Sequence, residues 1–386
     1  MAAKTYQLEE LAALAGVAPD VVLDWEAKGW LGDVPQARSG SDAATRAPVY
    51  GFEQAERCVE LGGRGIARRI CVVNQKGGVG KTTTAFTLAA ALADMGRRVL
   101  AIDLDAQANL TTSFGFDPDE LDLTSADLLT EEAVMPEDVI LETALEGVHA
   151  IPGDIKLCNV ETRIQDILMR EWILRTKLEP LFDRYDVLVF DCPPNLSRIT
   201  INALTSCEEV VVPIETQSYS IKAISDLTST FALLKEKMQH DLKVWILPTK
   251  VDRRMKLAGD ILDALDEGFR GQILDPIHID SNLIRAPLLC EPVTRAFPNT
   301  RASQEYARLA RFLVLPDDER QQWMDLPLAT RREVIARAEQ GADDLGIDPD
   351  GDPGVDPGVA PDGDDESEVN ASGARPRKGK RIRAKR

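Results

Sequence analysis

The sequence predicts a doubly wound α/β fold with a mostly parallel sheet, and three observations support this prediction. Short apolar runs alternate with helix-forming stretches along most of the chain, as in right-handed strand–helix–strand units. A glycine-rich loop, KGGVGKTTT, joins the apolar run at 70–73 to the helix-forming stretch AFTLAAALADMG. Acidic residues end two further apolar runs. Because ligands bind at the carboxyl ends of parallel strands, we expect one site at that edge of the sheet.

The glycine-rich loop has the composition of a phosphate-binding site. Lys81, at the start of the following helix, would reach the β- and γ-phosphates of a nucleotide, and the Thr82 hydroxyl would bind Mg²⁺. The common phosphate-loop pattern has glycine at position 75, whereas this chain has Gln75 and then an additional lysine, Lys76. Residues without a Cβ let backbone N–H groups turn toward phosphate oxygens, and the loop has three of them: Gly77, Gly78 and Gly80.

KGGVGKTTT resembles the deviant Walker A motif of the ParA/MinD ATPases, in which two subunits enclose two ATP molecules. The resemblance implies that Lys76 reaches across a dimer interface to the phosphates held by the other subunit. ATP would then form part of the contact between the subunits. ATP and Mg²⁺ are therefore the expected cofactors, and the loop residues expected to bind the nucleotide are Lys76, Gly77, Gly78, Val79, Gly80, Lys81, Thr82 and Thr83.

Two later segments supply the acidic residues of the expected site. GRRVLAIDLDAQANL predicts a strand from about 98 to 104, with Asp103 and Asp105 at its end, and resembles the second signature of the family. The resemblance implies that Asp105 handles the attacking water, although acids at a strand end can also cap the next helix. In YDVLVFDCPPNL, four apolar residues end in Asp191, as in a Walker B strand whose carboxylate holds Mg²⁺. The expected catalytic residues are Lys76, Lys81 and Asp105, and the expected metal-binding residues are Thr82, Asp105 and Asp191.

The remaining chain predicts a further strand at 148–155, one amphipathic helix at 159–181, and three more strand–helix units. The units pair 208–215 with 220–238, 243–254 with 257–269, and 272–279 with 302–314. PTKVDRR resembles the segment with which the family contacts adenine, which makes Thr249 and Asp252 nucleotide-binding candidates. Relatives place DNA-contacting cations on this side of the dimer, although each cation here fits a solvated surface charge equally well. The candidates are Arg253, Arg254, Lys256, Arg285, Arg295 and Arg301.

Residues 1–65 predict a small helical domain that precedes the ATPase domain at 66–315. Apolar residues at helical spacing lie on both sides of Gly16, and an aromatic and basic pair, Arg46 and Tyr50, follows. The pattern resembles a winged helix-turn-helix of the MerR type, which would bind DNA. A helical domain used for dimerisation or partner contact explains the same pattern.

The end of the chain changes composition abruptly. A helical appendage is expected at 316–342, and a disordered tail at 343–386. The tail has eleven acidic residues between 343 and 368 and eight basic residues in the last twelve, RPRKGKRIRAKR. Three roles for the tail are open. The basic end would bind DNA phosphates, or the acidic tract would compete with DNA for the basic end, or the tail would have no function. The last twelve residues have one large apolar residue, Ile382, and so cannot form the apolar face of the membrane-binding helix that ends MinD-type relatives.

Composition favours a cytoplasmic protein. The chain has 386 residues, 44% of them hydrophobic, and a net charge of −19, with no apolar run of about 18 residues and no signal-peptide pattern. The six cysteines are scattered without a CxxC pair, which indicates reduced thiols.

The family resemblance covers roughly residues 69–313 and implies a ParA-type partition ATPase at the nucleoid. Such a protein forms a homodimer with ATP, binds DNA without sequence preference and releases it when a ParB-like partner stimulates hydrolysis. Three alternatives remain at this stage. They are a nucleotide-switched transcriptional regulator acting through the N-terminal domain, a positioning ATPase for a non-DNA cargo, and an iron-protein-like reductase.

Overall fold

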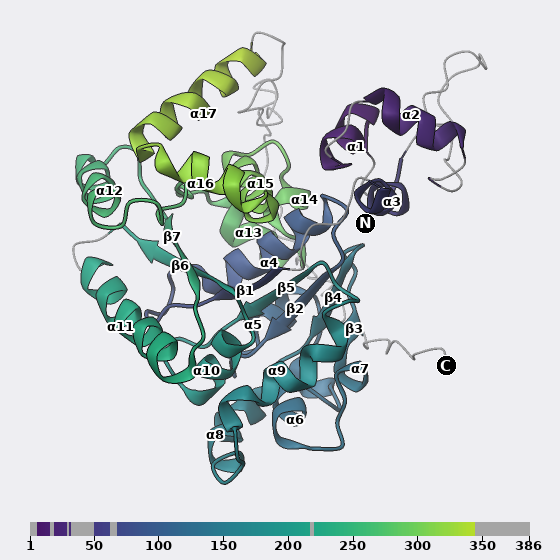
Figure 1. The fold of residues 1–386 in the computed structure, drawn as a ribbon, viewed down its shortest axis with the longest axis vertical. Coiled ribbons are helices and arrows are strands. Elements are labelled where there is room, and N and C mark those ends of the chain that lie inside the picture. The colour runs from purple at the N-terminus through teal and green to yellow at the C-terminus, as the bar shows by residue number, and fades with distance from the viewer. Residues whose placement is uncertain are drawn as a thin grey trace, which may run out of the picture.

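The computed structural model describes residues 6–15, 19–28, 31, 50–61, 68–216 and 220–343. Their centre is a seven-stranded sheet with the strand order β3-β4-β2-β5-β1-β6-β7, in which only the edge pair β3 and β4 is antiparallel (Figure 1). The predicted doubly wound, mostly parallel α/β fold is therefore confirmed. The strands are β1 (Arg68–Val72), β2 (Val99–Asp103), β3 (Leu141–Glu142), β4 (Val148–Ile151), β5 (Val187–Asp191), β6 (Glu209–Glu215) and β7 (Lys243–Thr249).

Helices cover both faces of the sheet, so the strands are buried on both sides (Figure 1). In β1, Ile70 and Val72 belong to one apolar cluster and Cys71 to the other, because successive side chains of a strand point to opposite faces. One face is packed by α4 (Lys81–Ala93), α5 (Asn109–Ser113), α13 (Asn282–Leu288), α14 (Val293–Ala296) and α15 (Arg301–Val314). The other is packed by α6 (Ser125–Thr130), α7 (Pro136–Val139), α8 (Val160–Arg163), α9 (Ile173–Leu178), α10 (Arg198–Thr205), α11 (Ser220–Met238) and α12 (Lys256–Gly268).

Two predicted elements differ in the structure. The single helix expected at 159–181 is broken into α8, α9 and short 3-10 turns. Met169 has a left-handed backbone with φ 57°, which an α-helix does not accommodate, and the apolar side chain of Leu168 is 91% exposed. The strand expected at 272–279 is reduced to two isolated bridges, Ile246 with Ile273 and Val251 with His278. Pro276 has no N–H to donate in the middle of that segment.

The N-terminal helices α1 (Leu8–Ala15), α2 (Pro19–Ala27) and α3 (Phe52–Leu61) pack around an apolar cluster of their own (Figure 1). Leu11, Val22 and Trp25 are buried in it, and Tyr6 forms a β-bridge with Tyr50. Residues 16–18 and 32–49, which include Arg46, lie outside the described residues. The helix-turn-helix assignment therefore stays a prediction.

Helix α3 makes close contact with the main body at two glycines. A Cβ at Gly147 would lie 2.3 Å from the Phe52 ring, and a Cβ at Gly96 would lie 2.8 Å from the Ala55 backbone. Both glycines also have left-handed φ angles, 80° and 71°. We call this contact the α3 seam. It lies at the amino-terminal edge of the sheet, because Gly96 follows α4 and Gly147 precedes β4.

Two C-terminal helices, α16 (Asp317–Asp325) and α17 (Leu328–Asp343), follow α15. They are held to the main body by two arginines that are almost completely buried. Arg320 pairs with Glu209 at 2.6 Å, and Arg331 donates to the Ile273 carbonyl at 2.7 Å and pairs with Asp275 at 3.2 Å. The predicted helical appendage thus packs against the ATPase body. Residues 344–386 of the predicted tail lie outside the described part.

No helix of the described residues combines the length and hydrophobicity needed to cross a membrane. All six cysteines fall within the described part of the chain and are free thiols. Cys71 and Cys192 lie side by side in the core, with their sulfur atoms 3.2 Å apart. Burial raises the pKa of both thiols well above the ordinary value, so neither has the character of a reactive thiolate.

Candidate functional site

The glycine-rich loop connects β1 to α4 at the carboxyl edge of the sheet. Gly78 and Gly80 have φ angles of 75° and 94°, a left-handed region that residues with a Cβ rarely adopt. A Cβ at either glycine, or at Gly77, would meet no atom within 4 Å, so the loop surrounds open space. The first turn of α4 has neither an acidic residue nor a side-chain cap. Its N–H groups and the positive end of its dipole are thus available to an anion.

Two side chains support this loop from behind. Asn74 donates from Nδ2 to the Pro213 carbonyl at 2.6 Å and accepts from the Lys76 N–H at 3.0 Å, which fixes the entry to the loop. The Thr249 hydroxyl lies 2.9 Å from the Val79 carbonyl and 3.1 Å from that of Ile214. Thr249 is buried, so in this structure it supports the loop, and its expected contact with adenine stays a prediction. Sequence reasoning missed Asn74, which directly follows the apolar run of β1.

Lys81 points back over the loop from the first position of α4. Its Nζ is 3.3 Å from the Lys76 carbonyl, and the residue is only 7% exposed. Burial lowers the pKa of Lys81, whereas the negative charges of Asp191 and Asp105 raise it. The structure thus brings together the predicted lysine and the two predicted carboxylates.

Asp103 and Asp191 end neighbouring strands and are paired in the sheet register. The Asp103 carboxylate is buried and accepts hydrogen bonds from the Thr111 N–H at 2.9 Å, the Thr111 hydroxyl at 2.7 Å and the Asp105 N–H at 3.1 Å. Burial raises the pKa of Asp103 to about 6; the hydrogen bonds from Thr111 oppose that rise and the charge of Asp105 adds to it. Asp103 therefore shapes the turn that carries Asp105.

Asp191 has a different environment. It is completely buried, and neither carboxylate oxygen makes a hydrogen bond to the described residues. Burial raises the pKa of Asp191 well above its ordinary value and the charge of Asp103 adds to the rise, whereas the nearby Thr82 hydroxyl and Lys81 ammonium oppose it. A buried carboxylate without a partner is costly unless a ligand satisfies it.

These residues fit Mg²⁺. Among the described residues, no group of three or more His, Cys, Asp or Glu side chains could hold a metal. Mg²⁺ in nucleotide sites needs only one or two protein oxygens, because water and phosphate oxygens complete its shell. Asp191 and Thr82 would supply those oxygens. The role of Asp105, which is 9% exposed and accepts from the Gln107 N–H at 3.0 Å, stays a prediction.

Lys76 is held within its own subunit. Its Nζ lies 2.6 Å from Oε2 of Glu215, and Nζ of Lys250 lies 2.9 Å from Oε1 of the same carboxylate. Partial burial raises the pKa of Glu215, but the hydrogen bonds from Lys76 and Lys250 bring it below the ordinary value. Sequence reasoning missed both Glu215 and Lys250. Glu215 ends β6, so the signal that indicated Asp103 and Asp191, an acid at a strand end, applied to it as well.

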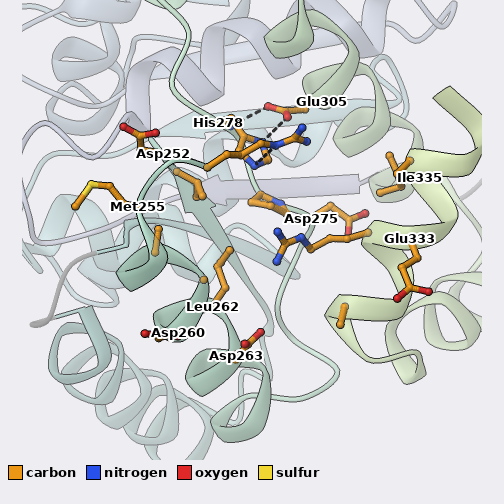
Figure 2. Close-up of a pocket in the computed structure, with 18 of the residues that line it drawn as sticks. Asp252, Met255, Asp260, Leu262, Asp263, Asp275, His278, Glu305, Glu333 and Ile335 are labelled. Carbon is orange, nitrogen blue, oxygen red and sulfur yellow. Dashed lines mark hydrogen bonds and ion pairs between the residues drawn. The ribbon is translucent and has the colours of Figure 1, made fainter. Parts of the chain in front are cut away.

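A cavity of about 720 Å³ lies between α12 and α17 (Figure 2). His278 and Glu305 form a buried pair in it, with His278 Nδ1 2.6 Å from Glu305 Oε1. Arg253 donates from Nε to Nε2 of His278 at 3.1 Å. The Asp252 carboxylate, also in this cavity, is bound by both Nε and the terminal amino group of Arg254, at 3.0 and 2.8 Å. The proposed contact of Asp252 with adenine stays a prediction.

The predicted DNA-contacting cations fall into two groups. Arg254, Lys256, Arg285 and Arg301 are exposed, and Arg285 also lies over the Phe297 ring, 5.2 Å from its centroid. Arg295 is different: it is 16% exposed, pairs with Asp94 at 2.9 Å and donates to the Glu146 carbonyl at 3.3 Å. This ion pair lies at the amino-terminal edge, near the α3 seam. The assignment of Arg295 to DNA stays a prediction, and in this structure its guanidinium contacts Asp94 and Glu146.

Comparisons with known proteins agree with this geometry. A family model described as an AAA domain matches residues 67–244. The sporulation initiation inhibitor protein Soj of Bacillus subtilis is 34% identical over 244 residues, which is 63% of this chain and 96% of Soj. The chromosome partitioning protein ParA of Myxococcus xanthus is 33% identical over 260 residues, covering 67% of this chain and 92% of that protein.

Solved structures with bound nucleotide also resemble this chain. The cobyrinic acid a,c-diamide synthase of Mycobacterium smegmatis, with a bound ATP analogue and magnesium, is 30% identical and superposes with a TM-score of 0.56. The alignment covers 64% of this chain and 95% of that one. The septum site-determining protein MinD of Pyrococcus horikoshii, complexed with Mg-ADP, is 27% identical with a TM-score of 0.51 and covers 63% of this chain and 94% of its own.

Proposed function

The chain belongs to the ParA/MinD superfamily of ATPases, with Soj and ParA among its relatives, and on that premise we propose that it is a partition ATPase. In this proposal ATP binding closes a homodimer, the dimer binds DNA without sequence preference, and a ParB-like partner stimulates hydrolysis and release. The single observation that carries the nucleotide site is the buried carboxylate of Asp191, which makes no hydrogen bond to the described residues and lies beside Lys81 and an open glycine loop. The place of action would be the nucleoid in the cytoplasm.

The residues of the site have distinct proposed roles in hydrolysis. Backbone N–H groups of the loop and the ammonium of Lys81 hold the phosphates in position. Asp105, at the edge of the site, orients the attacking water, and Asp103 fixes the turn on which Asp105 lies. Mg²⁺, when bound by Thr82 and Asp191, would neutralise negative charge on the phosphates. Catalysis is therefore mainly positioning and charge stabilisation.

Dimer formation and DNA binding are assigned to surface cations. Lys76 would leave Glu215 and contact the phosphates held by the partner subunit. The candidates for DNA phosphates are the exposed cations Arg254, Lys256, Arg285 and Arg301, together with Arg253, which is held by His278, and Arg295, which is paired with Asp94. Each contact of this kind makes the affinity for DNA decrease with salt.

The deciding experiment is binding of the purified protein to a random-sequence duplex with ATP, with ADP and without nucleotide, at one fixed salt concentration. Binding that requires ATP is expected. Asp105→Ala should retain ATP-dependent DNA binding but stop ATP hydrolysis. This variant therefore distinguishes dimer closure from the hydrolysis step. Binding that ignores the nucleotide would contradict the proposed cycle.

One observation favours a second candidate function, a nucleotide-switched regulator that acts through residues 1–65. Helix α4 begins at the phosphate loop and ends beside Gly96, where α3 contacts the main body. A shift of α4 when nucleotide binds or is hydrolysed would therefore be transmitted directly to α3 and the N-terminal helices. Tight binding to a single operator near the protein's own gene, with weak binding to random duplex, would favour this candidate.

A further inference from the structure

The loop from Asp105 to Thr111 is closed by one buried carboxylate. Oδ1 of Asp103 accepts from the Asp105 N–H at 3.1 Å, and Oδ2 accepts from the N–H and the hydroxyl of Thr111 at 2.9 and 2.7 Å. The two oxygens of Asp103 therefore bind the two ends of the loop. Asp103 is 1% exposed, so a donor that moved away would leave a desolvated carboxylate oxygen, which is costly.

The Thr111 hydroxyl also joins this loop to the segment that follows β4. While it donates to Asp103, it accepts from the Gly153 N–H at 2.8 Å, and a hydroxyl can do both at once. Gly153 in turn packs closely on Asp103, because a Cβ there would lie 3.0 Å from the Asp103 main-chain oxygen and 3.1 Å from its Cγ. Asp103, Thr111 and Gly153 thus form one buried unit, which we call the Asp103 clamp.

The loop that the Asp103 clamp closes has a strained backbone. Ala108 has φ 52° and ψ 32°, a left-handed conformation that is uncommon for residues with a Cβ and that persists where the surroundings determine it. The Ala108 N–H donates to the Asp105 carbonyl at 2.9 Å, and the Ala108 carbonyl accepts from the Thr112 N–H at 2.9 Å. The position of Asp105 therefore depends on a conformation that the loop would not favour by itself.

We propose that Thr111 is a positioning residue for ATP hydrolysis, which acts on Asp105 through Asp103. The inference rests on the proposed function, in which Asp105 orients the attacking water. Without the Thr111 hydroxyl, Asp103 loses one of its three donors and the Gly153 N–H loses its acceptor. The strained loop then relaxes and moves the Asp105 carboxylate away from the water. Because hydrolysis here is mainly positioning, a displacement of about 1 Å is enough to slow it strongly.

The test uses the full chain and compares the rate of ATP hydrolysis with the affinity for nucleotide. Thr111→Val keeps the branched shape and removes the hydroxyl, so kcat at saturating ATP and Mg²⁺ should fall about 10- to 100-fold. The Kd of a fluorescent, non-hydrolysable ATP analogue should be unchanged, and Thr111→Ser should recover most of the rate. Ser113→Ala is the matched control, because this hydroxyl lies on the same helix but donates to the Asn109 carbonyl at 2.8 Å.

A second substitution separates positioning from a general loss of stability. Glycine adopts left-handed φ angles without strain, so Ala108→Gly in the Thr111→Val background should raise kcat about 3-fold over Thr111→Val alone. Urea denaturation gives the folded fraction of each variant, and the rates are compared per folded molecule. The inference is overturned if Thr111→Val weakens analogue binding as much as it slows hydrolysis, if Thr111→Ser is as slow as Thr111→Val, or if Ala108→Gly recovers nothing.

The Asp105→Ala variant distinguishes failure of this inference from failure of the proposed function. If Asp105→Ala hydrolyses ATP at the wild-type rate, Asp105 does not orient the water and the proposed function itself loses its hydrolytic residue. If Asp105→Ala is inactive while Thr111→Val is as fast as the wild type, the inference about Thr111 is wrong and the proposed function is unaffected. Slow hydrolysis in both variants, with normal analogue binding, is the result that we expect.

Discussion

The two edges of the central sheet differ in whether their buried charged side chains have partners. At the amino-terminal edge the buried charges are paired: Asp186 accepts from the Arg98 N–H and guanidinium, and Glu209 binds Arg68, Arg320 and the Trp245 indole. At the carboxyl-terminal edge, Asp191 has no hydrogen bond to the described residues. Paired charges hold a fold together, whereas an unpaired one marks a place that a ligand completes. The contrast separates residues that stabilise the protein from residues kept for the nucleotide.

The largest expected effect is at the carboxyl-terminal edge. Lys81→Ala removes the ammonium that faces the phosphates and should weaken ATP binding by about 1,000-fold, or about 4 kcal/mol. Titration with a fluorescent ATP analogue measures the loss. The urea midpoint of the nucleotide-free protein should not fall, because Lys81 is a desolvated cation there. Normal ATP affinity in this variant would contradict the assignment of the loop.

The corresponding change at the amino-terminal edge should act on stability alone. Arg320→Met keeps the packing beside Trp245 and Phe312 but removes a buried counter-ion of Glu209, and should lower the free energy of unfolding by about 3 kcal/mol. Urea denaturation measures the change, with Arg311→Met on the exposed face of α15 as control. ATP affinity of the folded protein should be unchanged. If Arg320→Met lost affinity for ATP but kept its free energy of unfolding, the proposed difference between the two edges of the sheet would be wrong.

A pH titration sharpens the contrast at Asp103. Its folded pKa is about 6 and its ordinary value is 3.8, so the folded state binds more protons between these pH values. The contribution of Asp103 to the free energy of unfolding is therefore complete below about pH 4. It declines as the pH rises and is lost above about pH 6, a total of about 3 kcal/mol. Asp103→Asn should show a smaller decline across this window than the wild type. Identical pH profiles of the nucleotide-free proteins would show that Asp103 titrates normally.

The smallest expected effect has the opposite sign to that of Arg320→Met. Asp191→Asn removes a buried carboxyl group that makes no hydrogen bond to the described residues, and it should stabilise the nucleotide-free protein by about 1 kcal/mol. The same variant should lose the part of its ATP affinity that depends on Mg²⁺, measured by titrations with and without EDTA. Destabilisation together with an unchanged response to Mg²⁺ would mean that Asp191 is a structural residue.

The sequence was sufficient for those parts of the fold and site that depend on local pattern. Apolar runs between helical stretches predicted the sheet. The loop glycines are recognisable because they lie between a buried strand and a helix, and Asp191 is recognisable because it ends a buried strand. The contacts that were missed join residues far apart in the chain. Lys76 and Glu215 meet only because β1 and β6 are neighbours, and Arg295 pairs with Asp94 across 201 positions. The strand predicted at 272–279 is only two isolated bridges in the structure, and the sequence prediction was wrong there because periodicity does not report hydrogen-bond donors.

The α3 seam has a practical consequence for anyone who handles a shortened form of this protein. A chain that begins at Arg68 loses Phe52 and Ala55, and with them the cover over Ala93, Gly96 and Gly147. The surface uncovered there includes the methyl group of Ala93, which water solvates poorly, beside two glycines. Such a form should self-associate at high concentration through this patch, whether or not nucleotide is present. Dimerisation measured on a truncated chain would then report the missing helices and not the response to ATP.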